Sequence, residues 1–396
     1  MFYDLYYNGW NEEEMKAILR VLRSGQFTMG ELVSQFEDQF ANRFGVKHAV
    51  MVNSGSSANL LAIATLCYKK DRPLKPGDEV IVPGVAWSTT YFPLQQYGLK
   101  LKFVDVELDT LNLDPTQLER AFSPKTRLVV ASNTLGNPAA LDAIKNFCKK
   151  HNLYFLEDNC ESMGAEYKGI KCGMWGDIGT FSLSLASHMS TMEGGIIVTD
   201  DKEVYHIARS LRDYGSTAHL PHDSMAFQGA KRNPDGRTFL FPGYNVRPLE
   251  IAGAIGLEQL KKLDANLEVR RQNACLMQDL LKGDERFILQ RENSKSSWLG
   301  FSLILHPRWQ VDRERVLSRL KDEGIEYGLV SGGNFLQQPV MKYIHHEVVG
   351  ELKVANLIHS RAFFVGNHPQ DLTRQIERFH KVLASLPRAS SLKRAA

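Results

Sequence analysis

The sequence has few cysteines, and none of them is grouped as a metal site or a disulfide framework requires. Among 396 residues there are five cysteines, and no two of them form a Cys-x-x-Cys pair. Zinc sites, iron–sulfur clusters and disulfide frameworks all need closer grouping. We therefore expect reduced thiols, no bound metal and no iron–sulfur cluster. The five cysteines are Cys67, Cys148, Cys160, Cys172 and Cys275.

Long apolar runs and an excess of one charge are also missing. No stretch approaches the roughly 18 consecutive apolar residues of a membrane-spanning helix, and the N-terminus has no basic region followed by an apolar run. The formal net charge is only +3, and the one basic stretch is the short tail from Arg388 to Arg394. Nucleic acid and membrane are therefore not expected as partners, and the pattern predicts a soluble, cytoplasmic protein.

What the sequence does contain is an ordinary globular composition, 43% hydrophobic and 23% charged, in which short apolar runs alternate with helical segments. This alternation predicts a parallel sheet covered by helices on both faces. Strands are predicted at 49–52, 79–83, 101–106, 128–131, 153–156, 178–184 and 195–199. Helices are predicted near 57–69, 87–97, 115–122, 139–150 and 202–212.

The two ends of the chain read differently from this middle part. Two helices are predicted over 10–45, and a long polar loop over 214–241, a length typical of functional or disordered loops. A helical stretch at 248–282 follows, after which short strands and helices mix. We predict a large domain over 1–282, a small α+β domain over 283–387, and a tail over 388–396.

Two motifs at strand ends carry polar groups that suit a phosphorylated ring. Asn53–Asn59 follows the strand at 49–52, and a small Gly-containing turn that opens a helix aims N–H groups and hydroxyls at one point, as phosphate sites do. Leu156–Glu161 ends the strand at 153–156, at the rim where parallel sheets bind ligands. A carboxylate there can pair with a protonated pyridine nitrogen. Each motif alone is also compatible with a helix cap or a surface salt bridge.

Together with several later motifs, these segments resemble the DegT/DnrJ/EryC1/StrS sugar-aminotransferase family of fold-type I pyridoxal-phosphate enzymes. The resemblance covers about Phe27 to Pro387. It implies the fold of that family, a large three-layer αβα domain with a mostly parallel sheet and a small α+β C-terminal domain. The segments that carry it are Asn53–Asn59, Val82–Trp87, Gly136–Pro138, Glu157–Gly164, Gly179–Ser182, Glu193–Gly195 and Pro242–Arg247.

The resemblance implies a cofactor, pyridoxal 5'-phosphate or pyridoxamine 5'-phosphate, and residues that hold it. Ser56 and Ser57, joined by Ser182, are expected to bind the cofactor phosphate. Trp87 is expected to stack on the pyridine ring, and Asp158 to pair with the ring nitrogen.

The resemblance also implies a second copy of the chain. Asn245 is expected to reach the cofactor phosphate of the neighbouring subunit, so the family pattern implies a homodimer.

The lysine that ordinary members of the family use is missing. It stands six residues before the Glu of a Glu-Gly-Gly sequence, forms the Schiff base with the cofactor and later moves the proton. In this chain that position is Ser187, and no lysine occurs between Cys172 and Asp201. The simplest working cofactor is then the amine form, held without a covalent bond.

One branch of the family is known for this loss, the GDP-4-keto-6-deoxymannose 3-dehydratases and the related CDP-sugar dehydratases. The resemblance to the GDP-sugar branch implies C3 dehydration of a nucleotide-linked 4-keto-6-deoxyhexose, with glutamate reloading the cofactor. The product is expected to be a 3,6-dideoxy sugar for a surface polysaccharide such as the O-antigen of lipopolysaccharide. The matching segments are Trp87–Gly98, Glu157–Ala165, Thr191–Gly195, Ser296–Phe301 and Phe364–His368.

The catalytic base departs from the branch, which has two adjacent histidines, the first at the lysine position. Here the pair reads Ser187-His188. Neighbouring side chains of an extended segment point to opposite sides, so His188 faces away if Ser187 faces the cofactor, unless a bulge reverses them. His188 is therefore either the base or a structural histidine. Glu161 is a further catalytic candidate, because a carboxylate beside the cofactor can move protons or aid loss of the hydroxyl.

Two other functions stay open at this point. The chain could be a nucleotide-sugar aminotransferase or support another ketimine outcome, with water or Glu161 as the base. It could also be a catalytically silent paralogue that binds nucleotide sugar beside an active subunit. Tyr327–Leu329 stands where the branch usually has an arginine. His345 and His346 are expected at the surface, because adjacent histidines converge poorly on one metal ion.

Overall fold

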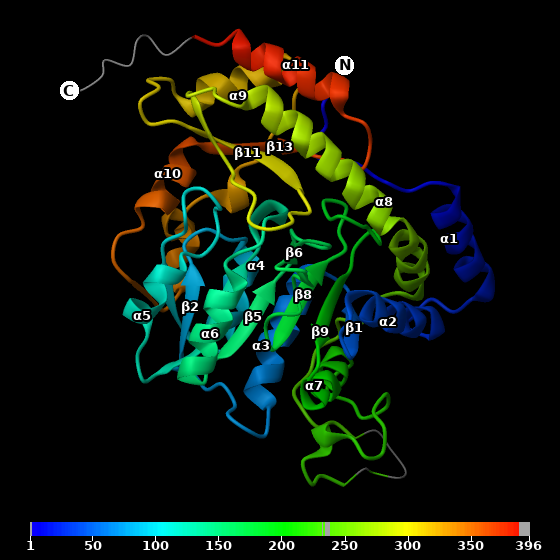
Figure 1. Ribbon diagram of the computed structural model, residues 1–396. Coiled ribbons are helices and arrows are strands. Elements are labelled where there is room, and N and C mark those ends of the chain that lie inside the picture. The colour runs from blue at the N-terminus through cyan, green and yellow to red at the C-terminus, as the bar shows by residue number, and fades with distance from the viewer. Residues whose placement is uncertain (1, 232, 234–237, 388–396) are drawn as a thin grey trace.

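The computed structural model describes residues 2–231, 233 and 238–387 (Figure 1). The predicted tail, 388–396, lies outside the described residues. Two domains are joined by the long helix α8 (Glu250–Leu281), which runs diagonally from the large sheet to the small domain (Figure 1). None of the helices in the described part of the chain is long and apolar enough to cross a membrane.

The large domain is built on an eight-stranded sheet. Neighbouring strands in this sheet are parallel, except that the second strand in spatial order runs antiparallel to both of its neighbours. The strands in spatial order are β1 (His48–Val52), β9 (Gly195–Thr199), β8 (Ile178–Ser182), β5 (Tyr154–Asp158), β4 (Thr126–Ser132), β2 (Glu79–Pro83), β3 (Lys100–Val104) and β12 (His346–Val348).

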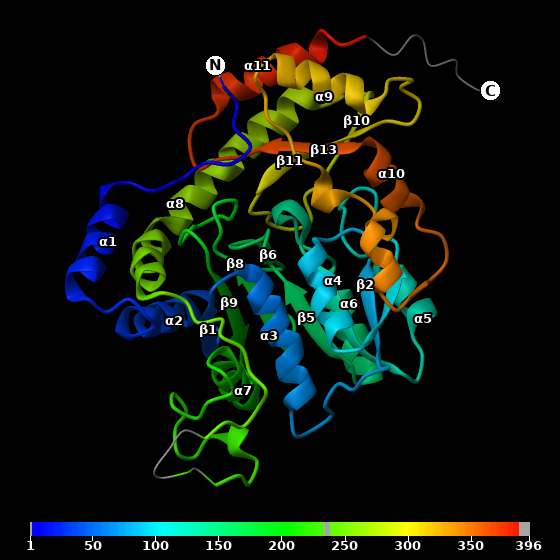
Figure 2. The ribbon, with the colours of Figure 1, turned by 180° about the vertical axis from the view of Figure 1, so that it is seen from behind.

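Helices cover both faces of this sheet because strand side chains alternate between them. Val50 and Val52 pack into the core with α3 (Gly55–Tyr68), α4 (Ser88–Gln96) and α7 (Lys202–Arg212), whereas Ala49 and Met51 pack with α2 (Glu31–Phe44) and α8. Two further helices, α5 (Leu118–Ala121) and α6 (Leu141–His151), pack against side chains of the middle strands β2, β3, β4 and β5 and form another core with them. Figure 1 shows α5 and α6 in front of the sheet. Figure 2, the view from the opposite side, shows α3 and α4 in front of it.

The small domain is an antiparallel sheet with helices packed on it. Its strands are β10 (Phe287–Leu289), β11 (Gly300–Leu305) and β13 (Ala362–Gly366). Its helices are α9 (Arg313–Asp322) and α11 (Thr373–Ala384), and α10 (Lys353–Arg361) leads into β13. A hairpin of β6 (Glu166–Tyr167) and β7 (Ile170–Lys171) and the N-terminal helix α1 (Glu12–Ser24) complete the chain.

The predicted fold class is confirmed, a three-layer αβα domain with a mostly parallel sheet and a small α+β domain. The bounds of β2, β9 and α7 are those predicted from the sequence. The strands β12 and β13 and the helix α10 were not predicted. β12 has three exposed residues and no apolar alternation, and it joins the edge of the large sheet beside β3. The chain therefore returns to the large domain within the range predicted for the small one.

The direction of the strands gathers several loops at one edge of the large sheet. The carboxyl ends of β1, β2, β4, β5 and β8 meet there, and the reversed strand β9 begins there. In parallel sheets this edge is where ligands bind. The small domain faces the same edge (Figure 2).

Candidate active site

A cavity of about 510 Å³ lies at this edge, between the loops that follow the strands and the small domain. Its opposite wall comes from the C-terminal part of the chain and includes Leu299, Gly328, Leu329 and Phe364. Six of the nine site residues predicted from the sequence line the cavity, and three do not. Those that line it are Ser56, Trp87, Asp158, Glu161, Ser182 and Ser187.

The first turn of α3 forms one end of the cavity. Ser54 caps the helix, and its hydroxyl accepts the Ser57 N–H at 3.1 Å and donates to the Ser57 hydroxyl at 3.0 Å. Ser57 is thus engaged within the turn, while Ser56 faces the cavity. A Cβ at Gly55 would lie 2.8 Å from the Ser182 Cβ, so only glycine lets this turn pack against the end of β8. Free N–H groups and the Ser56 and Ser182 hydroxyls converge here, which fits a phosphate.

Asp158 lies at the end of β5 and is buried against the cavity floor. Its Oδ2 accepts hydrogen bonds from Asn59 Nδ2 at 2.9 Å and Thr90 Oγ1 at 2.7 Å, and its Oδ1 accepts the Cys160 N–H at 3.1 Å. Three donors fix this carboxylate in place, and a fixed carboxylate fits a protonated ring nitrogen. The Trp87 side chain, 58% exposed, offers an uncovered aromatic face to the same space. These residues fit a pyridoxal-phosphate ring.

Glu161 lies one turn beyond Asp158 and faces the cavity. Its Oε2 accepts the Leu135 N–H at 2.8 Å. Burial of the carboxyl raises the pKa of Glu161 to about 7, although the Leu135 N–H and the Ser331 hydroxyl pull that pKa down. A carboxyl group with this pKa exists in both protonation states near neutral pH, so it can both take and give a proton.

The turn between β8 and β9 sends its two key side chains in different directions. Ser187 lines the cavity, and its hydroxyl lies 3.2 Å from that of Ser184. His188 is 3% exposed and is not among the cavity-lining residues; its Nε2 lies 3.1 Å from the Ser297 carbonyl oxygen. Because a carbonyl only accepts, this Nε2 carries the proton. Burial and the neighbouring Arg270 charge hold the pKa of His188 well below its usual range, so the imidazole is neutral.

Asn245 lies outside this cavity, on an exposed part of the chain. Its Oδ1 accepts from Arg247 Nε at 3.2 Å. The next residue, Val246, accepts the Asn53 N–H at 3.0 Å, which places Asn245 close to the phosphate turn but on the outer surface. In this chain Asn245 therefore does not contribute to its own cavity.

Several residues of the site were not predicted from the sequence. Asn59 and Thr90 orient Asp158. Both stand inside segments that carry the family resemblance, Asn53–Asn59 and Trp87–Gly98, so their positions in the sequence could have indicated them. Tyr6 also lines the cavity, but it precedes the segment that carries the family resemblance, and no pattern singles it out.

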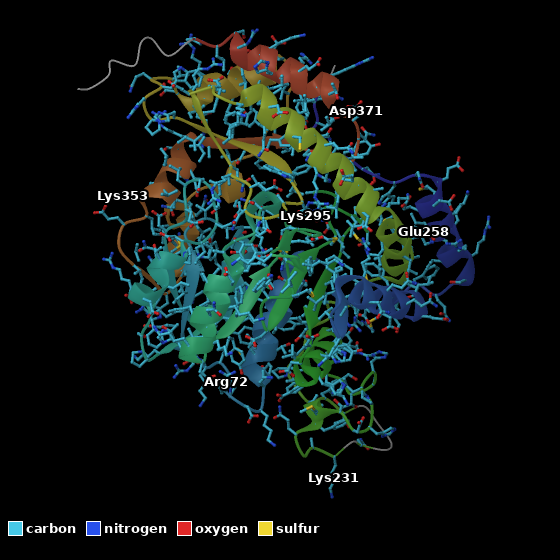
Figure 3. The ribbon with its side chains drawn as sticks, viewed as in Figure 1. Arg72, Lys231, Glu258, Lys295, Lys353 and Asp371 are labelled. Carbon is cyan, nitrogen blue, oxygen red and sulfur yellow. The ribbon has the colours of Figure 1, made fainter. Side chains whose placement is uncertain are left out.

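The charged groups of the cavity are all acidic. Among the described residues that line it, Asp158, Glu161 and Glu193 carry carboxyl groups, and there is no lysine, arginine or histidine. Figure 3 shows cationic side chains such as Arg72, Lys231 and Lys353 pointing outward from the periphery of the molecule. Over the residues that the structure describes, no group of three or more His, Cys, Asp or Glu side chains is arranged to hold a metal ion.

Comparison with known proteins relates this site to characterised enzymes. Residues 9–384 match the model of the DegT/DnrJ/EryC1/StrS aminotransferase family. GDP-4-keto-6-deoxy-D-mannose 3-dehydratase from Yersinia pseudotuberculosis is 46% identical, over 94% of this chain and 96% of that protein. A solved variant of GDP-4-keto-6-deoxymannose-3-dehydratase with bound GDP-perosamine superposes with a TM-score of 0.94 at 45% identity, covering 96% of this chain and 100% of the other. The same type of enzyme with a trapped PLP–glutamate geminal diamine gives a TM-score of 0.93 at 45% identity and the same coverage.

Proposed function

This chain belongs to the DegT/DnrJ/EryC1/StrS aminotransferase family, and from this premise we propose that it is a 3-dehydratase of a nucleotide-linked 4-keto-6-deoxyhexose. The substrate is GDP-4-keto-6-deoxymannose, and the reaction removes its C3 hydroxyl on the way to a dideoxy sugar. The observation that carries the proposal is a cavity with the residues for a pyridoxal-phosphate ring but with Ser187 where the lysine belongs. The 46% identity to a GDP-4-keto-6-deoxy-D-mannose 3-dehydratase supports the choice of substrate.

The cofactor is pyridoxal 5'-phosphate, used in its amine form. The first turn of α3 with Ser56 and Ser182 would hold its phosphate, Trp87 its ring face, and Asp158 its ring nitrogen. When bound, it supplies a primary amine that links to the sugar ketone and an electron-accepting ring that lets the neighbouring hydroxyl leave.

No lysine lines the cavity in the described part of the chain, so the cofactor is held by non-covalent contacts alone. A lysine there completes amino-group transfer in ordinary members of the family, because it forms a Schiff base and moves the proton. The hydroxyl of Ser187 does neither at neutral pH. Because the Ser187 hydroxyl is not basic, elimination of the C3 hydroxyl is favoured over amino-group transfer.

We assign the proton transfer to Glu161. In its ionised form the carboxylate takes a proton inside the cavity, and in its neutral form it gives one back to the departing hydroxyl, which leaves as water. Its pKa of about 7 suits both tasks at neutral pH. His188 then acts as a structural histidine, because its hydrogen bond to Ser297 ties the imidazole to the far side of the turn.

The partners that we propose are the nucleotide sugar, glutamate as the amine donor, and a second copy of the chain. The exposed position of Asn245 beside the phosphate turn suits a contact with the cofactor phosphate of another subunit. Exposed apolar side chains near the cavity mouth, Trp87, Leu185, Met192 and Leu329, also suit cover by a partner. A cytoplasmic location stays a prediction.

The test is an incubation of the purified protein with pyridoxal phosphate, glutamate and GDP-4-keto-6-deoxymannose. We expect ammonia and a 3-deoxy keto sugar in equal amounts, measured by an enzymatic ammonia assay and mass spectrometry. Formation of an amino sugar instead would assign the chain to the aminotransferases. Binding of the sugar without any product would identify a silent paralogue.

A further inference from the structure

The N-terminal segment from Phe2 to Asn11, here called the strap, is anchored on both sides of the cavity. Tyr3 exchanges backbone hydrogen bonds with Gly324 and Glu326, at 3.0 and 2.9 Å, and its hydroxyl donates to the Gly366 carbonyl at 2.7 Å. At the other end, Trp10 Nε1 donates to the Ser190 carbonyl at 3.0 Å, in the loop that carries Ser187. The strap therefore runs from the small domain to the turn between β8 and β9.

Between these anchors the strap places one side chain in the cavity, that of Tyr6. The Leu5 N–H donates to Glu326 Oε2 at 2.8 Å, which fixes the backbone directly before Tyr6. Tyr6 is 46% exposed, so a ligand in the cavity can reach it. Within the described residues its hydroxyl has no hydrogen-bond partner, in contrast to the hydroxyl of Tyr3.

The Tyr6 phenol stays protonated and faces an acidic group. Burial, and next the negative charge of Glu161, raise the pKa of Tyr6 above its ordinary value. A protonated phenol is a hydrogen-bond donor, and with a pKa above its ordinary value Tyr6 is protonated at neutral pH. The same cavity is also lined by Leu299, Leu329 and Phe364, whose side chains offer no polar group to a ligand.

The charges in the cavity indicate the kind of ligand atom that Tyr6 meets. The charged groups that act on the Tyr6 hydroxyl are the carboxyls of Glu161 and Glu326, and no cationic side chain is among the described residues that line the cavity. This suits a neutral ring that carries hydroxyls, and it disfavours an anionic group at this position. The hexose is the part of the proposed substrate with that chemistry, whereas the diphosphate is not.

We propose that Tyr6 is a specificity-determining residue that donates a hydrogen bond to a hydroxyl of the hexose and holds the sugar against Glu161. The strap is then part of the active site and not only a connection to α1. This inference rests on the proposed function, since it assigns the sugar end of a nucleotide-sugar substrate to this wall.

The experiment compares Tyr6→Phe with a matched control, Tyr7→Phe. Tyr7 is the next residue of the strap; its ring lies 5.8 Å from that of His368, and it is not among the residues that line the cavity. Dissociation constants for GDP-perosamine and for GDP are measured by calorimetry on the protein loaded with pyridoxal phosphate. Removal of one neutral hydrogen bond should weaken GDP-perosamine binding about three- to tenfold and leave GDP binding unchanged. Tyr7→Phe should leave both values unchanged.

The inference is overturned if Tyr6→Phe binds GDP-perosamine as tightly as the wild type, or if it weakens GDP and GDP-perosamine equally. It is also overturned if the wild type binds the two ligands with equal affinity, because the sugar then contributes nothing. Melting curves show whether each variant is folded, and a Tyr6→Phe variant with a lowered melting temperature is replaced by Tyr6→His, which keeps a ring and a donor and should retain the preference for GDP-perosamine.

Failure of the proposed function has a separate signature. A wild-type protein that binds GDP-perosamine more tightly than GDP, but makes no 3-deoxy product, refutes the dehydratase activity and leaves the Tyr6 contact in place. A wild-type protein that makes product while Tyr6→Phe binds and reacts identically refutes the Tyr6 contact alone.

Discussion

At the scale of single residues, Glu161 matters most, because it is the carboxyl group of the cavity whose surroundings suit proton transfer. Asp158 is held by three donors, which suits the pairing with a ring nitrogen that we propose for it. Glu161 has one backbone donor, from Leu135, and its desolvation raises its pKa to about 7. The two carboxyl groups stand three positions apart, and we propose different roles for them because their environments differ.

Replacing Glu161 with glutamine should abolish most of the activity. The change Glu161→Gln keeps an acceptor for the Leu135 N–H but cannot take a proton, so kcat/KM should fall about 10²- to 10⁴-fold. In the wild type kcat/KM should rise with pH through about 7, where Glu161 ionises to become the base. Steady-state kinetics between pH 5.5 and 8.5, roughly one and a half units around that pKa, measure both effects.

The control is Glu166→Gln, on β6 and paired with Lys295 outside the cavity. It should show wild-type rates and the same pH profile. A Glu161→Gln variant that retains full activity would remove Glu161 from the mechanism and return the base to His188 or water.

The same residue should also affect stability. The pKa of Glu161 in the folded protein is raised above the ordinary value of 4.5. The stabilisation of the fold that results is fully present below pH 4.5 and is lost as the pH rises through about 7. Glu161→Gln removes this loss. The melting temperature of Glu161→Gln minus that of the wild type should therefore be larger at pH 8 than at pH 5, by about 2 °C or more. A difference that is independent of pH, measured by scanning calorimetry, would contradict the raised pKa.

At the scale of secondary-structure elements, the turn between β8 and β9 determines which side chain lines the cavity. It is not an extended strand, yet it sends Ser187 into the cavity and His188 toward Ser297. The loop is held from outside by Trp10, whose indole donates to Ser190. The directions of these two side chains therefore depend on contacts with segments far away in the sequence.

Lysine substitutions test these directions. We expect borohydride treatment of the wild type loaded with pyridoxal phosphate to leave no pyridoxyl group on the protein. Ser187→Lys should become labelled, because its amine enters the cavity, whereas His188→Lys should stay unlabelled. Peptide mass spectrometry locates the label. Labelling at position 188 and not at 187 would show that the turn presents the other side chain.

At the scale of the whole molecule, the cavity exists because the small domain and the strap close over the carboxyl edge of the large sheet. The return of the chain to β12 and α10 packs the C-terminal part against the core of the large domain, which holds this wall in place. The exposed position of Asn245 and the apolar side chains around the mouth fit the second copy that we propose as a partner.

Mixing two inactive variants tests a shared site. If Asn245 serves the neighbouring subunit, Asn245→Ala and Glu161→Gln damage different chains of the same site. Mixed dimers then contain one intact site, so co-expression should recover about a quarter of wild-type activity. Each variant alone should stay impaired, and size-exclusion chromatography should show a dimer. Absence of any recovery in a confirmed mixed dimer would place Asn245 outside the shared site.

Much of the site was predictable because parallel strands end at a common edge. Ser56, Trp87, Asp158 and Ser182 lie at or just after the ends of different strands, and all four line the cavity as expected. The contribution of Tyr6 was not predictable, since nothing in its neighbours indicates that the strap folds back over the cavity. The strand β12 was missed for a similar reason: its three residues are exposed, and only their pairing with β3 makes them a strand.

The amino-acid sequence alone determined the family, the cofactor class and the missing lysine, because these depend on which side chains follow which strand. Only the tertiary structure decided that Ser187 and not His188 lines the cavity, that Glu161 has a pKa of about 7, and that Tyr6 stands opposite it. The physical reason is that the orientation and desolvation of a side chain are set by atoms from distant segments, which a local pattern does not contain.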